Sequence, residues 1–182
     1  STPFSSSTTG QPLDLGHVGA GGPCFIVLSG PSARAVDLGA LSRRGIYTIA
    51  TNNAGTLVRP SGWTCVDPPR KFHNSIWQDP AVTKFCPTTM LGRHLRRKLQ
   101  DGRFETILKP DGSNLTPRDC PHVVGYSRKP TFCAERYLSE PHVNWGVSRK
   151  FHRQEKKTGR DRPRILNVMF AVVKIAYSLG FR

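Results

Sequence analysis

The sequence predicts an α/β fold, in which a Rossmann-like, mainly parallel sheet is flanked by helices. Three observations predict it: short apolar runs bounded by glycine or proline, a helical segment between the first two runs, and small polar residues directly after every run. The runs lie at residues 24–28, 46–50 and 63–66. Connected parallel strands bring their carboxyl ends to one edge of a sheet, and ligands of open α/β sheets bind at that edge.

Each run has its own reason to be a strand. Residues 24–28 are continuously apolar, which suits a strand buried on both faces. Residues 46–50 are rich in β-branched side chains, and residues 63–66 form a third short strand. Between the first two strands, Ser32 is placed to cap a helix over residues 33–41.

Residues 89–180 predict two helices, one strand and a long loop region. Residues 89–100 predict a helix, because leucines recur every four positions and a glycine stops the pattern. Residues 104–108 predict a strand, whereas the five prolines in residues 110–147 predict loops. Residues 165–179 are apolar nearly all round and predict a buried helix that ends at Gly180.

The composition divides the chain into two regions. Residues 1–22, rich in Ser, Thr, Gly and Pro, predict a flexible arm. Residues 23–182 predict a Rossmann-like nucleotide-binding domain with a loop-rich basic insertion at about 110–162. The chain stops where a further strand is expected, so the fold is expected to be incomplete at its C-terminal end. A second chain that completes the fold is one alternative.

The net charge and the cysteines indicate which binding partners and which cellular compartment to expect. The net charge is +15, which favours polyanions, although a solvated basic surface that binds nothing specific is the alternative. Five cysteines without a CxxC pair indicate a reducing compartment. The spacing of Cys120, His122 and Cys133 fits no common zinc pattern, so no metal site is expected. No apolar stretch reaches the roughly 18–20 residues that span a bilayer, and no secretory signal is evident, which predicts a cytoplasmic or viral protein.

The turn after the first strand is the leading candidate for a ligand site. Gly30 allows a ligand to approach the backbone, Ser29 and Ser32 offer hydroxyls, and free amides at a helix start attract phosphate. An ordinary strand-to-helix turn is the alternative. After the second strand, Asn52 and Asn53 offer paired donors and acceptors that suit a ribose or a base.

Asp67 closes the third strand, where it could hold a ribose, a metal ion or a proton. Its alternative role is to cap the turn before two prolines. Five histidines are possible general bases, and the sequence selects none of them: His73, His94, His122, His142 and His152.

Four segments, residues 25–32, 48–53, 65–67 and 171–181, resemble a known group of proteins. The group comprises the bacterial sialyltransferases with a Rossmann-like glycosyltransferase domain and the related MptE-like (6-hydroxymethylpterin diphosphokinase-like) and motility-accessory proteins. Their Gly-Pro-Ser turn follows the first strand, and an Asn follows the second.

The resemblance implies a glycosyltransferase-like or pyrophosphotransferase-like protein that uses a nucleotide or nucleotide-sugar, such as a CMP-sugar. It implies that the pocket is lined by Ser29, Gly30, Ser32, Asn52 and Asp67, with Asn167 near the nucleotide. The sequence departs from the family at Arg182, because the next strand and the family's histidine base would follow this residue.

Two basic segments predict contact with nucleic acid, since cations beside aromatic residues bind phosphates and stack bases. A solvated loop is the alternative for each. The candidate residues are Arg93, Arg96, Arg97 and Lys98 in the first segment and Arg149, Lys150, Arg153, Lys156, Lys157 and Arg160 in the second. The alternative function is therefore a noncatalytic nucleic-acid-binding or viral assembly protein with a degenerate version of the fold.

Overall fold

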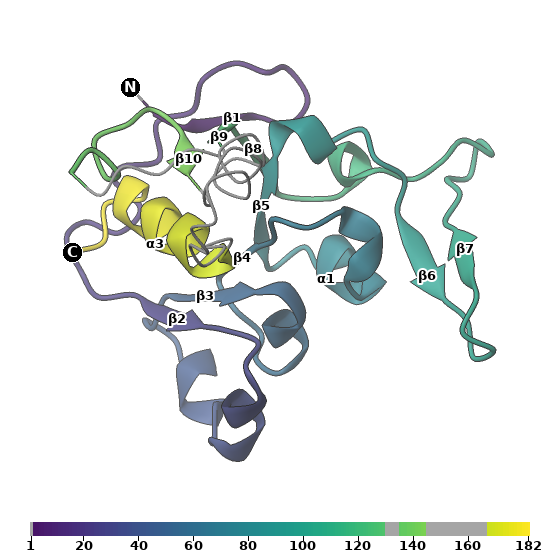
Figure 1. Ribbon diagram of the computed structural model, residues 1–182, viewed down its shortest axis with the longest axis horizontal. Helices are drawn as coiled ribbons and strands as arrows, with labels where there is room; N and C mark the ends of the chain where they lie inside the picture. Colours follow the sequence, from purple (N-terminus) through teal and green to yellow (C-terminus); the bar gives the residue numbers. More distant parts are fainter. Residues whose placement is uncertain (1, 130–134, 145–166) are drawn as a thin grey trace, which may run out of the picture.

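Five parallel strands and one antiparallel edge strand form the central sheet, in the order β1-β8-β5-β4-β3-β2 (Figure 1). The computed structural model describes residues 2–129, 135–144 and 167–182. The predicted α/β character and mainly parallel sheet are confirmed. The strands of the sheet are β1 (Phe4–Ser6), β2 (Phe25–Val27), β3 (Thr48–Thr51), β4 (Gly62–Thr64), β5 (Thr83–Pro87) and β8 (Val123–Tyr126).

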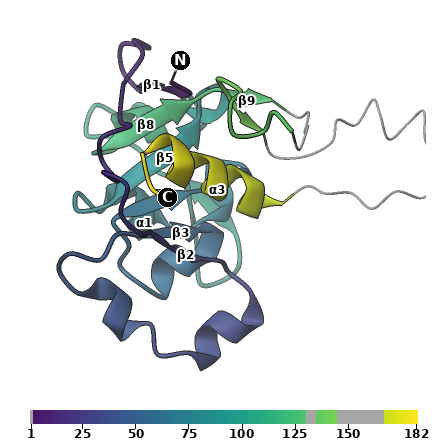
Figure 2. The same cartoon turned by 90° about the vertical axis from the view of Figure 1, so that its left-hand side faces the viewer.

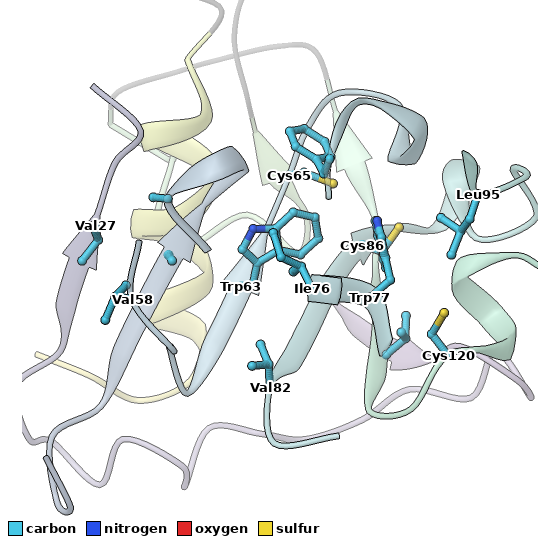
Figure 3. Packing of buried hydrophobic residues seen from close by; sticks show 14 of the residues in the cluster. Val27, Val58, Trp63, Cys65, Ile76, Trp77, Val82, Cys86, Leu95 and Cys120 are labelled. Carbon is cyan, nitrogen blue, oxygen red and sulfur yellow. The ribbon is translucent and has the colours of Figure 1, made fainter. Parts of the chain in front are cut away.

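The crossovers between neighbouring parallel strands all pack on one face of the sheet. The five parallel strands succeed one another across the sheet in chain order, with the β6–β7 segment inserted between β5 and β8. Right-handed connections between such strands pass over the same face. Trp63 and Trp77 lie in the core cluster on this face, with ring centroids 4.9 Å apart (Figure 3). Short helices, all 3-10 except α1, carry the crossovers: η1 (Pro31–Ala35), η2 (Gly39–Ser42), η3 (Asn52–Thr56), η4 (Pro69–Lys71), α1 (Asn74–Gln78), η5 (Thr88–Met90) and η6 (Pro117–Asp119).

Helix α3 (Val168–Ser178) covers the opposite face, where it shares a second core cluster with Ile49 and Phe85 (Figure 2). The predicted burial is confirmed for one face of the helix only, because Met169 is 47% and Tyr177 37% exposed. The helix has one apolar face and one face toward solvent.

The end of α3 is the one that the sequence predicts. The amide of Phe181 donates to the carbonyl of Ala176 at 3.2 Å, and the amide of Gly180 donates to that of Tyr177 at 3.0 Å. Gly180 has a φ of +93°, a left-handed conformation that favours glycine. This pattern is a Schellman motif, which satisfies the last carbonyls of the helix.

The helix predicted over residues 33–41 is wrong. The segment forms η1 and η2 instead, and Val36 between them is extended, with φ −109° and ψ 137°. The carboxylate of Asp37 accepts a hydrogen bond from the amide of Gly39 at 2.8 Å. Such local side-chain bonds compete with the helical pattern, which explains the break.

The helix predicted over residues 89–100 is also wrong. After η5 the chain forms a hairpin of β6 (Arg96–Lys98) and β7 (Phe104–Thr106), which projects from the sheet (Figure 1). Asp101-Gly102 lies in its turn, and Asp-Gly is a hairpin signal. Leu95 is buried, but it anchors the base of the hairpin rather than a helical face.

Composition favours a flexible arm over residues 1–22, yet part of this segment belongs to the sheet. Strand β1 pairs with β8, and Phe4 is only 2% exposed. The amide of Gly19 also donates to the carbonyl of Leu179 at 2.7 Å, which ties the segment to the end of α3. Tertiary contacts therefore order a segment whose polar composition indicates a linker.

A second small sheet lies beside α3, where β9 (Arg128–Lys129) pairs in parallel with β10 (Val143–Asn144). The hydroxyl of Tyr137 donates to the carbonyl of Phe170, and the ammonium of Lys174 donates to that of Leu138. In the described ranges, no helix has the length and apolar character needed to cross a membrane.

Candidate phosphate-binding site

Four arginines line a hollow of about 630 Å³ at the carboxyl ends of β4, β5 and β8. Arg70 lies in η4 after β4, Arg93 and Arg96 follow η5 after β5, and Arg128 follows β8. Since parallel strands share one edge, these three connections bring their cations together. The other lining residues are Pro68, Pro69, Thr89, Met90, Gly92 and His94. We name this site the arginine hollow.

Backbone contacts hold part of the arginine hollow in place. The guanidinium Nη1 of Arg128 donates to the carbonyl of Val66, which follows β4, at 2.8 Å. Strand β6, which begins with Arg96, lies against η4, which carries Arg70. Arg96 and Arg70 therefore approach the hollow from two elements that contact each other.

The arginine hollow is lined by cations and by no acidic side chain of the described ranges. None of the lining residues that the structure describes is Asp or Glu. Within the described ranges, Arg70, Arg93 and Arg96 form no ion pair. The neighbouring Asp67 pairs instead with Lys71 at 3.2 Å. Guanidinium groups bind phosphate with two parallel hydrogen bonds, so the arrangement is suited to a phosphorylated ligand.

A second hollow, of about 320 Å³, lies at the carboxyl ends of β2 and β3. Three of the predicted site residues line it, Ser29, Gly30 and Asn53, together with Arg34. We name it the serine hollow. The longer helix expected to start at this turn is not formed, since η1 is a five-residue 3-10 helix. Ser32 lies within η1 and does not line the hollow.

Asn52 has a structural role in the backbone directly after β3. Its φ is +51°, a left-handed conformation that asparagine tolerates, and its carbonyl accepts a hydrogen bond from the indole of Trp63 at 2.7 Å. Its side-chain Oδ1 is buried with no hydrogen-bond partner in the described part of the chain. Asn52 does not line the serine hollow, whereas its neighbour Asn53 does.

Asp67 and Asn167, two further predicted ligand residues, have structural partners. Asp67 forms the ion pair with Lys71 and does not line the arginine hollow. Asn167 is the N-cap of α3, because its side-chain Oδ1 accepts a hydrogen bond from the amide of Met169 at 2.9 Å. Neither residue lines the serine hollow.

The first basic segment divides into two groups. Arg93 and Arg96 line the arginine hollow, whereas Arg97 forms an ion pair with Glu105 at 2.6 Å and Lys98 is exposed on β6. The second segment lies outside the described residues, and with it Arg149, Lys150, Arg153, Lys156, Lys157 and Arg160.

The histidines have different surroundings. His73 caps α1 and its Nδ1 lies 2.7 Å from Ser75 Oγ, while His94 lines the arginine hollow. His122 occupies a turn with φ +51°. His142 lies 3.6 Å from Glu140; burial and the charge of Lys129 lower its pKa. His152 lies outside the described residues.

The described thiols are not arranged as a metal site or as nucleophiles. Burial raises the pKa of Cys24 and Cys120 to about 11 and that of Cys86 to about 12, so these thiols are neutral at pH 7. In the part of the chain that the structure describes, no three His, Cys, Asp or Glu side chains lie together as metal ligands. Cys133 lies outside this part.

Sequence reasoning missed three arginines at the two hollows: Arg34, Arg70 and Arg128. Arg70 follows the predicted third strand by a few residues, so its place at the carboxyl edge was a usable signal. Arg128 follows β8, in the proline-containing region predicted as loops, and gave no such signal. Comparison with known proteins adds no relative, since no family model, no curated protein and no solved structure matches the chain.

Proposed function

We propose that the chain binds a nucleotide or nucleotide-sugar at the carboxyl edge of its sheet, with the phosphates in the arginine hollow. The observation that carries the proposal is the convergence of Arg70, Arg93 and Arg96 on a hollow whose described lining contains no acidic residue. Its volume lies within the roughly 300–1,000 Å³ of small-molecule sites. Binding at this edge is also the behaviour of Rossmann-like sheets, the fold that we propose for the chain.

The serine hollow is the proposed site for the ribose and base. It opens at β2 and β3, about two strand spacings, or roughly 10 Å, from β5. An extended nucleotide reaches across such a distance. The amide of Asn53 offers both a donor and an acceptor there.

Calorimetric titration with CMP, UDP, GDP and their sugar derivatives tests the proposal. At least one ligand should bind, and Arg93→Gln should weaken its affinity by roughly 10-fold or more, because a hydrogen bond to a charged group contributes about 1.5–3 kcal/mol. Arg44→Gln is the matched control, since this exposed arginine precedes β3 at the amino edge of the sheet. Absence of binding by every ligand would refute the proposal.

The proposed activity is transfer of a sugar or a pyrophosphoryl group, and it rests on the resemblance of residues 25–32 and 48–53 to the sialyltransferase and MptE-like group. Release of CMP from a CMP-sugar, or of AMP from ATP, measures donor turnover without a known acceptor. Turnover that Arg93→Gln abolishes and Arg44→Gln leaves intact would support it. Absence of release from each donor that binds would count against transferase activity.

A second candidate function is binding of nucleic acid, and the hairpin β6–β7 favours it. Arg96 and Lys98 are exposed on β6, and the whole chain has a net charge of +15. This function requires no catalysis and suits the proposed alternative of a nucleic-acid-binding or viral assembly protein. Filter binding across salt concentrations tests it, because release of counterions makes such binding fall steeply with salt. Binding that does not respond to salt would exclude it.

A further inference from the structure

The two faces of the hairpin β6–β7 differ in charge. In an antiparallel pair, directly opposed residues share a face, and alternate residues share a face along each strand. Lys98 lies opposite Phe104 and Arg97 lies opposite Glu105. One face therefore carries Arg96, Lys98 and Phe104, and we name it the basic face. The other carries Arg97 and Glu105.

Ion pairs neutralise the hairpin away from the basic face. Arg97 and Glu105 pair across the strands at 2.6 Å, and Arg103 pairs with Asp101 near the turn at 2.6 Å. In the described ranges, Arg96 and Lys98 form no ion pair. The basic face thus presents two cations, about 7 Å apart along the strand, without an acidic neighbour on that face.

Phe104 adds an exposed aromatic ring to the same face. It is 54% exposed, although a phenylalanine gains stability from burial, and it lies directly opposite Lys98. Arg96 belongs both to this face and to the lining of the arginine hollow. The basic face therefore extends outward from the hollow along the hairpin. Figure 1 shows that the hairpin projects from the sheet.

We propose that the basic face of β6–β7 binds single-stranded nucleic acid. Phe104 stacks on an unpaired base, Arg96 and Lys98 contact the phosphates on either side, and the backbone continues into the arginine hollow. A base is available for stacking on an aromatic ring only when it is not enclosed in a duplex, so the exposed Phe104 favours a single strand. The inference rests on the second proposed function. It adds the class of nucleic acid and the residues that contact it.

Fluorescence anisotropy tests the inference on the full chain, with labelled 12-nucleotide oligo-dT and oligo-U strands and a 12-base-pair duplex. Phe104→Ala should weaken binding of at least one single strand by about 10-fold and change duplex binding less than twofold. Phe104→Trp should restore single-strand binding. The exposure of Phe104 makes these variants compatible with folding, which circular dichroism checks.

Salt dependence tests the cations. Arg96→Gln with Lys98→Gln should reduce the slope of log affinity against log salt by about 1.4 for a single strand, since each phosphate contact contributes about 0.7. Arg97→Gln is the control from the paired face and should leave the slope unchanged. Salt-sensitive binding that Phe104→Ala leaves intact would overturn the single-strand inference and retain nucleic-acid binding. Failure of all three probes to bind at low salt would overturn both.

Discussion

The indole of Trp63 donates a hydrogen bond to the backbone carbonyl of Asn52 at 2.7 Å, and Asn52 adopts a left-handed conformation at the end of β3. A tryptophan of β4 thereby holds the residue at which the chain turns away from the sheet. Asn53, the next residue, lines the serine hollow. The position of this proposed ligand residue depends on a contact within the core.

Trp63→Phe should destabilise the fold more than Trp77→Phe. Both indoles are completely buried, but only Trp63 donates a hydrogen bond, while Nε1 of Trp77 has no partner in the described residues. The difference in the free energy of unfolding should be about 1–2 kcal/mol, because Trp63→Phe removes a buried hydrogen bond and Trp77→Phe removes none. Urea denaturation of the two variants measures it, and equal destabilisation would contradict this role.

Gly180→Ala should be more damaging than Gly45→Ala. Both glycines have a positive φ, +93° and +87°, and alanine in that conformation costs about 1–2 kcal/mol. A Cβ at Gly45 would meet open space, whereas one at Gly180 would lie 2.0 Å from the carbonyl oxygen of Gly16. Thermal unfolding should show an additional loss of roughly 1–3 kcal/mol for Gly180→Ala, as for other overpacked sites. Similar melting temperatures would show that residues 16–22 move away freely.

Lys84 should make stability rise with pH above about 8. Its side chain is fully buried in β5, its ammonium donates to the carbonyls of Asp79 and Pro121 at 2.6 Å, and burial lowers its pKa to about 8. The unfolded chain, with a pKa near 10.5, binds more protons than the folded chain between these values, so stability increases with pH in that window. The rise should reach about 3 kcal/mol at most.

Comparison with Lys84→Met isolates this contribution. Deprotonation of thiols and tyrosines acts in the opposite direction, because burial raises the pKa of Tyr47 to about 12 and that of Cys86 to the same value. These groups are common to both proteins. The stability of Lys84→Met relative to the parent should therefore decrease from pH 8 to 10.5. Parallel curves in urea titrations over this range would contradict the prediction.

Asn167→Ala should cost about 1 kcal/mol in the free energy of unfolding, since it removes the N-cap of α3, and Asn167→Asp should retain the stability. Chemical denaturation measures both. A capping role predicts unchanged nucleotide affinity in each folded variant. Reduced affinity without a change in stability would instead support the ligand role that the family resemblance implies.

The sequence was sufficient for β2, β3 and β4, because each is a short apolar run followed by small polar residues. It was insufficient for β5, where a buried lysine interrupts the apolar pattern. Leucines at positions 91, 95 and 99 fit a helical period. However, the amide of Leu95 donates to the carbonyl of the distant Leu115 at 2.8 Å, and β6 pairs with β7. Local spacing cannot reveal such partners.

The sequence predicted part of the serine hollow but not the arginine hollow. Ser29, Gly30 and Asn53 lie together because they follow neighbouring parallel strands, which the sequence indicates. The arginine hollow depends on β8, which lies in a region without a recognisable pattern, and on a hairpin that resembled a helix. The resemblance to sialyltransferase-like proteins stays a prediction.

The contact between residues 16–22 and the end of α3 has a consequence for folding. Gly19 and Gly21 donate to the carbonyls of Leu179 and Gly180, so segments about 160 positions apart close one face of the sheet. Contacts of such long sequence separation form late and slow the reaction, because the loop entropy is lost before they stabilise the chain. During synthesis, Ile49 and Phe85 lack their contacts with α3 until α3 has left the ribosome. A nascent chain arrested before α3 should therefore be a substrate for chaperones, and release of α3 should end that dependence.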